Sequence, residues 1–216
     1  MRFPRFISVC IGLFAATTAS AEIELSFYGG VQGALSSDVA ISGDDAIADS
    51  NFDVDWEGRS FDTPPYYGVR ITNWQNESFG YGLDFAHNKV YPPDADLPEG
   101  FSRLEFTDGL NTLTVNAYYR WQDAFGTVTP YVGGGVGLSI PHVEVITENS
   151  RTFGYQVAGA AATWIVGASM PIADRWSVFG EYKGTYSVNE ADLDTGGTLS
   201  TDIVTNALNV GVTFSF

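Results

Sequence analysis

The sequence predicts an all-β protein, an eight-stranded antiparallel transmembrane β-barrel with short periplasmic turns and long extracellular loops. Three observations support this: hydrophobicity alternates with a period of two, eight segments show that alternation, and the connections between them are alternately short and long. Single-chain bacterial barrels usually have an even number of strands, with both termini in the periplasm.

The alternation is clearest in residues 203–216. Even positions there are mostly apolar, as in Val204 and Leu208, while odd positions are small or polar, as in Thr205 and Ser215. Such a strand suits a wall between lipid and a narrow lumen. The same pattern predicts strands at 23–35, 65–74, 78–88, 109–121, 128–140, 155–170, 176–187 and 203–216.

The connections agree with this topology. Short ones are expected at 74–77, 122–126 and 171–175, and long ones at 36–64, 89–108, 141–154 and 188–202. Aromatic residues near strand ends would form belts at the two membrane interfaces; they are Trp74, Tyr119, Trp121, Trp164, Trp176 and Phe214. The alternative is a periplasmic or secreted β-sandwich, which also has short alternating strands.

The amino terminus predicts export. Arg2 and Arg5 precede an apolar run over residues 6–16, and Ala19-Ser20-Ala21 suits signal-peptidase cleavage. We therefore expect a signal peptide at 1–21 and one barrel domain at 22–216, located in the outer membrane of a Gram-negative bacterium. The single cysteine, Cys10, lies in the signal, so the mature chain would have no thiol chemistry.

The chain is strongly acidic, with 26 Asp and Glu against 10 Lys and Arg. This balance makes nucleic acid an unsuitable partner. Most of the acids fall in the expected outer loops, where they would repel anionic lipid unless divalent cations bridged the two.

Several local strings resemble a known family. They are Trp56–Phe61, Pro64–Gly68, Phe85–Tyr91, Arg103–Asn111, Tyr131–Gly137, Pro141–Val145 and Trp176–Lys183. Over nearly the whole mature chain they look like the alphaproteobacterial outer-membrane barrels described as lipid A oxidases. The terminal Val210–Phe216 also resembles the signal read by the outer-membrane barrel-assembly machinery.

The resemblance implies oxidation of the proximal glucosamine of lipid A to 2-aminogluconate, with dioxygen as co-substrate and peroxide as product. Lipid A or lipopolysaccharide and the assembly machinery would be the partners, and we expect a monomer. A non-catalytic structural or adhesion barrel is the alternative. A porin is a weaker choice, because side chains fill an eight-stranded interior.

An oxidase must handle electrons, yet the mature chain has no cysteine, dinucleotide fingerprint or haem-attachment motif. We therefore expect no nucleotide or haem, and a divalent metal ion is the simplest remaining cofactor. His87, Glu105 and His142 are the candidate ligands, and Asp108 joins them as a candidate catalytic residue. Alternatively, both histidines are rim residues, since they share the parity of lipid-facing positions.

Two further sets of residues are predicted. Trp56, Tyr66 and Tyr91 would contact the sugar, and Arg59, Lys89 or Arg103 would hold phosphate. Inward parity also predicts charges that must pair in the lumen, with Tyr28, Tyr66 and Tyr118 beside them; they are Glu24, Arg70, Asp84, Arg120, Glu181 and Lys183. A salt-bridged plug is favoured over a catalytic or conducting lumen.

Overall fold

The computed structural model describes residues 22–93, 97, 99–106, 108–122 and 124–216. The predicted signal peptide, with Cys10, lies outside the described residues. Eight strands form the wall: β1 (Glu22–Ala34), β4 (Tyr67–Trp74), β5 (Phe79–Asn88), β7 (Leu110–Arg120), β8 (Thr129–Thr147), β10 (Gly159–Ala173), β11 (Trp176–Asp192) and β12 (Thr198–Ser215).

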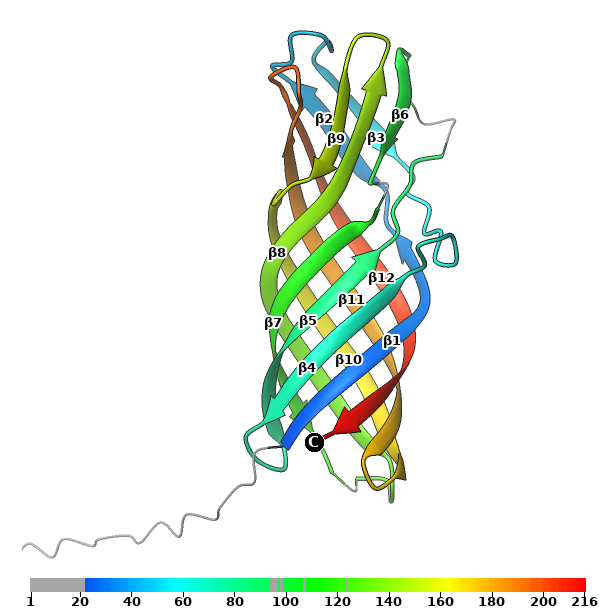
Figure 1. Ribbon diagram of the computed structural model, residues 1–216, viewed down its shortest axis with the longest axis vertical. Helices are drawn as coiled ribbons and strands as arrows, with labels where there is room; N and C mark the ends of the chain where they lie inside the picture. Colours follow the sequence, from blue (N-terminus) through cyan, green and yellow to red (C-terminus); the bar gives the residue numbers. More distant parts are fainter. Residues whose placement is uncertain (1–21, 94–96, 98, 107, 123) are drawn as a thin grey trace, which may run out of the picture.

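These strands pair in that order, always antiparallel, and β12 also pairs with β1, which closes the ring (Figure 1). The predicted antiparallel barrel is thus confirmed. The first described residues and the carboxyl terminus lie at the end with the short turns, the predicted periplasmic end.

The outer wall is apolar. On β12, Leu208 and Val210 point outward and are 63% and 71% exposed, whereas Ala207 and Asn209, which alternate with them, are buried. Large apolar side chains are exposed in the same way on the other wall strands, among them Phe27, Ile71, Leu83, Val115, Val136 and Val166. Soluble proteins rarely expose an apolar surface of this extent, so a β-sandwich in water is excluded.

Three wall strands extend further at the loop end of the barrel than predicted. β8 has 19 residues, β11 has 17 and β12 has 18, whereas crossing the bilayer takes about 9 to 11. They therefore continue beyond the membrane, and the predicted ends at 140 and 187 and the predicted start at 203 are wrong.

Parts of the long connections are also strands. β2 (Ser37–Ser42) pairs with β12, and β3 (Ser50–Val54) pairs with β2. β6 (Phe101–Glu105) and β9 (Arg151–Tyr155) both pair with the outer part of β8. Together they form an outer extension that stands on the barrel (Figure 1).

The outer extension has its own hydrophobic core. Its buried residues come from all four long connections and the ends of the long strands; they include Val39, Ile41, Trp56, Leu104, Val143, Val145, Leu193 and Leu199. This explains the wrong strand ends, because inside the extension apolar side chains point inward, opposite to their orientation in the membrane wall.

Five aromatic rings in the lumen each lie opposite a glycine on the neighbouring strand. A Cβ on any of these glycines would come within 2.7 Å of the ring, so only glycine leaves room for it. The cross-strand pairs are Tyr28–Gly68, Trp74–Gly80, Tyr118–Gly133, Tyr131–Gly167 and Phe179–Gly211. Trp74 was expected at the interface, but it points inward and is 6% exposed.

Four charged side chains form a buried network at mid-lumen. Arg70 donates from Nε to Asp84 at 2.8 Å and from both terminal nitrogens to Glu181 at 2.8 and 2.9 Å. Lys183 contacts Asp84 and donates to the Tyr28 hydroxyl, which itself donates to Asp84. The two cations and two anions therefore neutralise one another.

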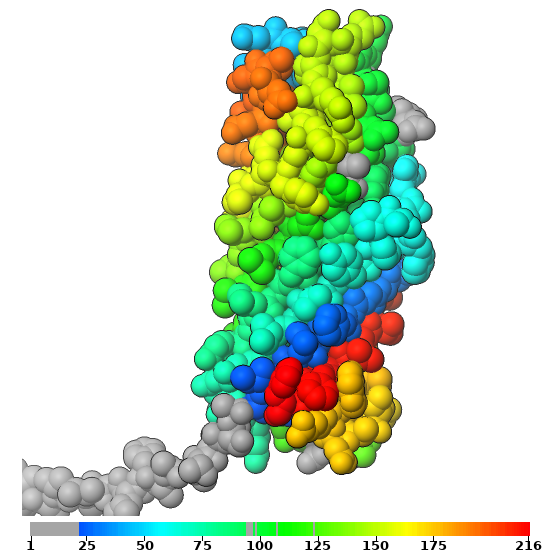
Figure 2. All heavy atoms as spheres, viewed as in Figure 1, coloured from blue at the N-terminus to red at the C-terminus, as the bar shows by residue number. Residues whose placement is uncertain are grey.

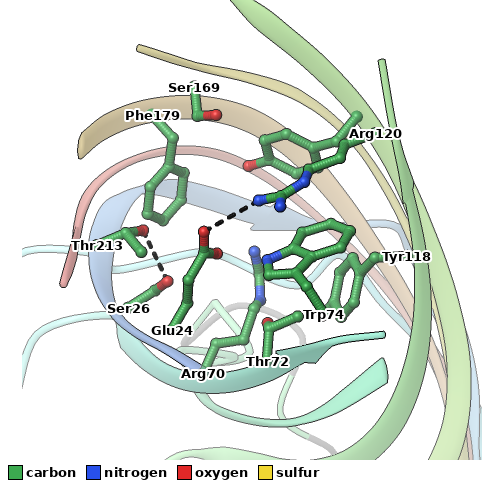
Figure 3. A pocket seen from close by; sticks show the side chains of 11 residues that line it. Glu24, Ser26, Arg70, Thr72, Trp74, Tyr118, Arg120, Ser169, Phe179 and Thr213 are labelled. Atoms are coloured by element: carbon green, nitrogen blue, oxygen red, sulfur yellow. Dashed lines mark hydrogen bonds and ion pairs between the residues drawn. The ribbon is translucent and has the colours of Figure 1, made fainter. Parts of the chain in front are cut away.

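The remaining lumen charges lie nearer the periplasmic end. Arg120 pairs with Glu22 at 2.9 Å and with Glu24 at 3.2 Å, and its guanidinium lies 3.9 Å from the centre of the Trp74 ring. A small pocket of about 40 Å³ separates this group from the central network (Figure 3), which is room for little more than ordered water. All six predicted lumen charges are thus in ion pairs.

Among the described residues, no helix is long and apolar enough to span a membrane.

Asp44 links two outer connections. Its Oδ1 accepts the N–H groups of Ala46 and Ile47, each at 2.8 Å, and its Oδ2 accepts the Thr195 hydroxyl at 2.6 Å and the Gly197 N–H at 3.3 Å. Desolvation alone would raise the pKa of Asp44, but the hydrogen bonds from Thr195 and the backbone outweigh it and lower the pKa.

A carboxyl group with a lowered folded-state pKa stabilises the fold above its unfolded pKa, about 3.9, and loses that effect as the pH falls through the folded value. We expect the amides of residues 44–49 and 193–197 to stay protected from hydrogen exchange at neutral pH and to lose protection below about pH 4. Asp44→Asn should lack much of this protection at every pH, while Asp45→Asn serves as the neighbouring control. Equal protection in both variants would contradict the link.

Breaking the central network should destabilise the barrel. Asp84→Asn leaves Lys183 and Arg70 short of an anionic partner, so we expect a loss of about 3–5 kcal/mol in the free energy of unfolding. Urea unfolding in detergent micelles measures it. The exposed control Asp202→Asn should change the free energy by no more than about 0.5 kcal/mol, and Asp84→Asn combined with Lys183→Met should recover part of the loss. A loss no larger than the control's would refute the role of the network.

Candidate functional site

A pocket of about 370 Å³ opens on the lipid-facing side of the wall, where the barrel meets the outer extension. The outward-facing rows of apolar side chains end here. On β5 the next outward position after Phe85 is His87, and on β8 the next one after Ile140 is His142. The lining residues are Pro64, Tyr67, Phe85, His87, Asp108, Asn111, Ile140 and Tyr155. Figure 2 shows the face with wall strands β4 and β5 below the outer extension.

His87 faces outward, as its parity predicts, yet it is only 5% exposed. The Tyr67 ring stacks on it with centroids 5.2 Å apart, and a Cβ on Gly109 would lie 2.4 Å from its Cε1. Gly109 also has a φ of +92°, which favours glycine. The imidazole is therefore held between a tyrosine ring and a close stretch of backbone.

The two ring nitrogens of His87 differ in their surroundings. Nδ1 lies 2.8 Å from Oδ1 of Asn111, the second residue of β7. Nε2 is buried and has no hydrogen-bond partner within the described part of the chain. Since buried polar atoms nearly always have partners, this nitrogen is a candidate contact for a ligand.

Asp108 is a second ionisable group of the pocket, and His142 lies next to it. Its Nε2 is 3.8 Å from Oδ2 of Asp108, too long for a hydrogen bond but close enough for an ion pair when the ring is protonated. The ring is buried and packs edge-on against Phe153 and Tyr155 at 4.5 and 4.6 Å. The Asp108 side chain is 47% exposed, so the carboxylate, rather than the imidazole, meets a ligand.

Two tyrosines complete the rim of the pocket. Desolvation, with the nearby Asp108 carboxylate and Tyr67, raises the pKa of Tyr155 above its usual value. The phenol therefore stays protonated at neutral pH. Tyr67 and Tyr155 are 41% and 59% exposed, which makes them available to donate hydrogen bonds to sugar hydroxyls.

Glu105 does not join this pocket. It pairs across β6 and β8 with Glu144, and Arg103 bridges the two carboxylates at 3.4 and 3.0 Å. No group of three His, Cys, Asp or Glu side chains among the described residues is placed to hold a metal ion. The predicted set of His87, Glu105 and His142 therefore does not form a three-ligand metal site in this structure.

The predicted sugar contacts lie elsewhere. Trp56 is buried in the core of the outer extension, 5.8 Å from the Phe106 ring, and Tyr66 is buried in the lumen. Tyr91 is buried too, and its ring is contacted by Arg59 and Lys89, each 4.9 Å from the centroid. The structure brings none of these aromatic residues to the wall pocket.

The predicted phosphate contacts are also dispersed. Lys89 has 0% exposure, so it cannot meet a lipid phosphate as placed. Arg59 is partly exposed and pairs with Glu57 at 3.1 Å, while Arg103 is held by Glu105 and Glu144. Of the predicted catalytic, metal-binding and substrate-binding residues, the structure brings only His87, Asp108 and His142 to the wall pocket.

Three polar residues of the pocket, Tyr67, Asn111 and Tyr155, were not among the predicted site residues. A signal for Asn111 exists, because it is a polar residue on the lipid-facing parity of β7, in line with Leu113 and Val115. Tyr155 had no such signal, because the prediction placed it at the start of a wall strand, whereas it ends β9 in the outer extension.

The sequence matches the family model of the outer membrane protein β-barrel domain over residues 6–216. No curated protein matches the chain. Among solved structures, the outer membrane protein AlkL in lipid bilayers is 16% identical with a TM-score of 0.51, and the match covers 100% of this chain and 97% of that one.

Two further structures are similar. OprG of Pseudomonas aeruginosa is 12% identical with a TM-score of 0.51, covering 91% of this chain and 97% of that one. Neisserial surface protein A is 14% identical with a TM-score of 0.50, covering 90% and 97%. At these identities the likenesses show the fold alone. Because the family model spans the whole described structure, the chain belongs to the outer membrane protein β-barrel family, and its apolar wall faces the lipid of a Gram-negative outer membrane.

Proposed function

We propose that this barrel is a lipid-modifying enzyme that works from its membrane side, oxidising the proximal glucosamine of lipid A to 2-aminogluconate with dioxygen. The observation that carries the proposal is the pocket with His87 and Asp108 on the lipid-facing wall, at the level where the apolar rows end. Ionisable groups at such a position are costly in lipid and mark functional sites.

The position suits a lipid substrate with a sugar headgroup. Phe85 and Ile140 provide an apolar floor next to the membrane, while Tyr67 and Tyr155 offer hydrogen bonds. A lipid in the outer leaflet could enter sideways without leaving the bilayer. Among the described residues, the pocket inside the lumen is much smaller, about 40 Å³, and lies beside a network of paired charges.

The reaction balances without another co-substrate. Oxidation of the sugar at C1 to a lactone releases two electrons and two protons. Dioxygen takes up the two electrons and the two protons and becomes hydrogen peroxide. Water then opens the lactone to the aminogluconate. The chain's own part in this scheme is proton transfer at His87 and Asp108 and orientation of the sugar by the tyrosines.

The charges of the outer connections and the barrel fold suggest two kinds of partner. The outer connections are rich in Asp and Glu, so divalent cations would bridge them to anionic lipid. The barrel-assembly machinery would recognise the last wall strand, β12.

A second candidate is a non-catalytic barrel that presents its outer surface for adhesion or strengthens the membrane. The outer extension favours it, because a hydrophobic core shared by all four long connections gives a stable platform above the membrane. The two candidates differ in one respect that can be measured, the mass of lipid A.

Mass spectrometry of lipid A from cells with and without the protein tests the proposal. We expect one added oxygen on the reducing-end sugar, dependent on both the protein and air. His87→Ala and Asp108→Asn should lower the conversion by about 10²- to 10⁴-fold, as for the loss of a general acid or base.

The matched control is Asp53→Asn, which removes an exposed carboxylate from β3, away from the pocket. It should leave the conversion unchanged. If folded wild-type protein leaves lipid A unaltered in air, the oxidase function is refuted and the non-catalytic barrel takes its place.

A further inference from the structure

We infer that Asn111 is a positioning residue, which holds His87 in the tautomer whose Nε2 accepts a proton from a ligand in the wall pocket. This rests on the proposed function, but it concerns one hydrogen bond that can be measured without any substrate. Asn111 lies on β7 and His87 on the neighbouring β5, as a cross-strand pair.

The geometry fixes the assignment. Oδ1 of Asn111 can only accept a hydrogen bond, so Nδ1 of His87, at 2.8 Å, must carry the hydrogen. In a neutral imidazole the lone pair then lies on Nε2.

The free nitrogen has the surroundings of a base. Nε2 is buried and has no hydrogen-bond partner within the described ranges. Burial, together with the Lys89 charge, lowers the pKa of His87, although the hydrogen bond to Asn111 and the Asp108 carboxylate act in the opposite direction. Tyr67 covers the ring and is 41% exposed, so a turn of its side chain would admit a ligand.

In the proposed oxidation, His87 Nε2 takes the proton of the C1 hydroxyl. The C1–H bond gives up its two electrons and its proton to dioxygen, and the C1–O bond becomes the carbonyl of the lactone. The proton held on His87 completes the hydrogen peroxide. Asn111 makes no contact with the reacting atoms in this step and acts through His87.

Imidazole NMR tests the tautomer directly. The sequence has two histidines, so two-bond ¹H–¹⁵N spectra of the ¹⁵N-histidine-labelled, refolded protein contain two rings, and His142→Gln assigns them. We expect His87 to carry its hydrogen on Nδ1. Asn111→Leu should convert it to a mixture of tautomers, whereas the control Asn206→Leu, on the lipid-facing side of β12, should leave it unchanged.

Activity measurements test the consequence. Asn111→Leu should lower lipid A oxidation on the order of 10- to 100-fold, as when a partner that orients a histidine is removed. Asn111→Asp keeps the acceptor but favours the imidazolium, so it should retain oxidation at high pH and shift the rising limb of the pH–rate profile upward by about 1–3 pH units.

The outcomes separate the two claims. Hydrogen on Nε2 of His87 in the wild-type protein overturns the inference, whatever happens to lipid A. The expected tautomer together with unaltered lipid A overturns the proposed function and the role of His87 as a base. The expected tautomer with an unchanged rate in folded Asn111→Leu removes Asn111 from the mechanism and leaves the oxidase standing.

Discussion

The neutral network of Arg70, Asp84, Glu181 and Lys183 is the constraint on which the rest of the barrel depends. The four side chains come from β4, β5 and β11, and all four are buried, so each depends on the others for its ion-pair partners. A slip of one residue in any of these strands would turn its charge toward lipid. The network therefore fixes the register of the strands, and with it which side chains form the outer wall.

A lumen filled in this way leaves the outside of the wall as the place for chemistry. Along most of each strand the outward positions are apolar, and that rule fails where His87, Asp108 and Asn111 meet. Local departures from an otherwise consistent pattern are expected at functional sites. The hydrogen bond between His87 and Asn111 and the contact between His142 and Asp108 give each ionisable group of the pocket a polar support.

The membrane part of the fold could be predicted from the sequence because alternation there has a single cause, lipid on one side and a crowded lumen on the other. The six lumen charges followed from the same parity. Beyond the membrane this cause ends, so Val143 and Val145 point into a second core that the pattern does not anticipate. The surroundings of Glu105 could not be predicted in this way. Its ion-pair partner Arg103 lies two residues away on the same strand, but the sequence does not show that Arg103 also pairs with Glu144 of β8.

The shared core of the outer extension also limits how the surface of this protein can diversify. Its side chains come from four separate connections, so a loop transplanted alone from a related barrel would leave a hole in that core or overfill it. Sequence variation at the cell surface is then confined to the tips of the hairpins, while the stems must change together. In a barrel whose loops are independent, each loop could be replaced separately. In this barrel, the connections of the outer extension could be replaced only together.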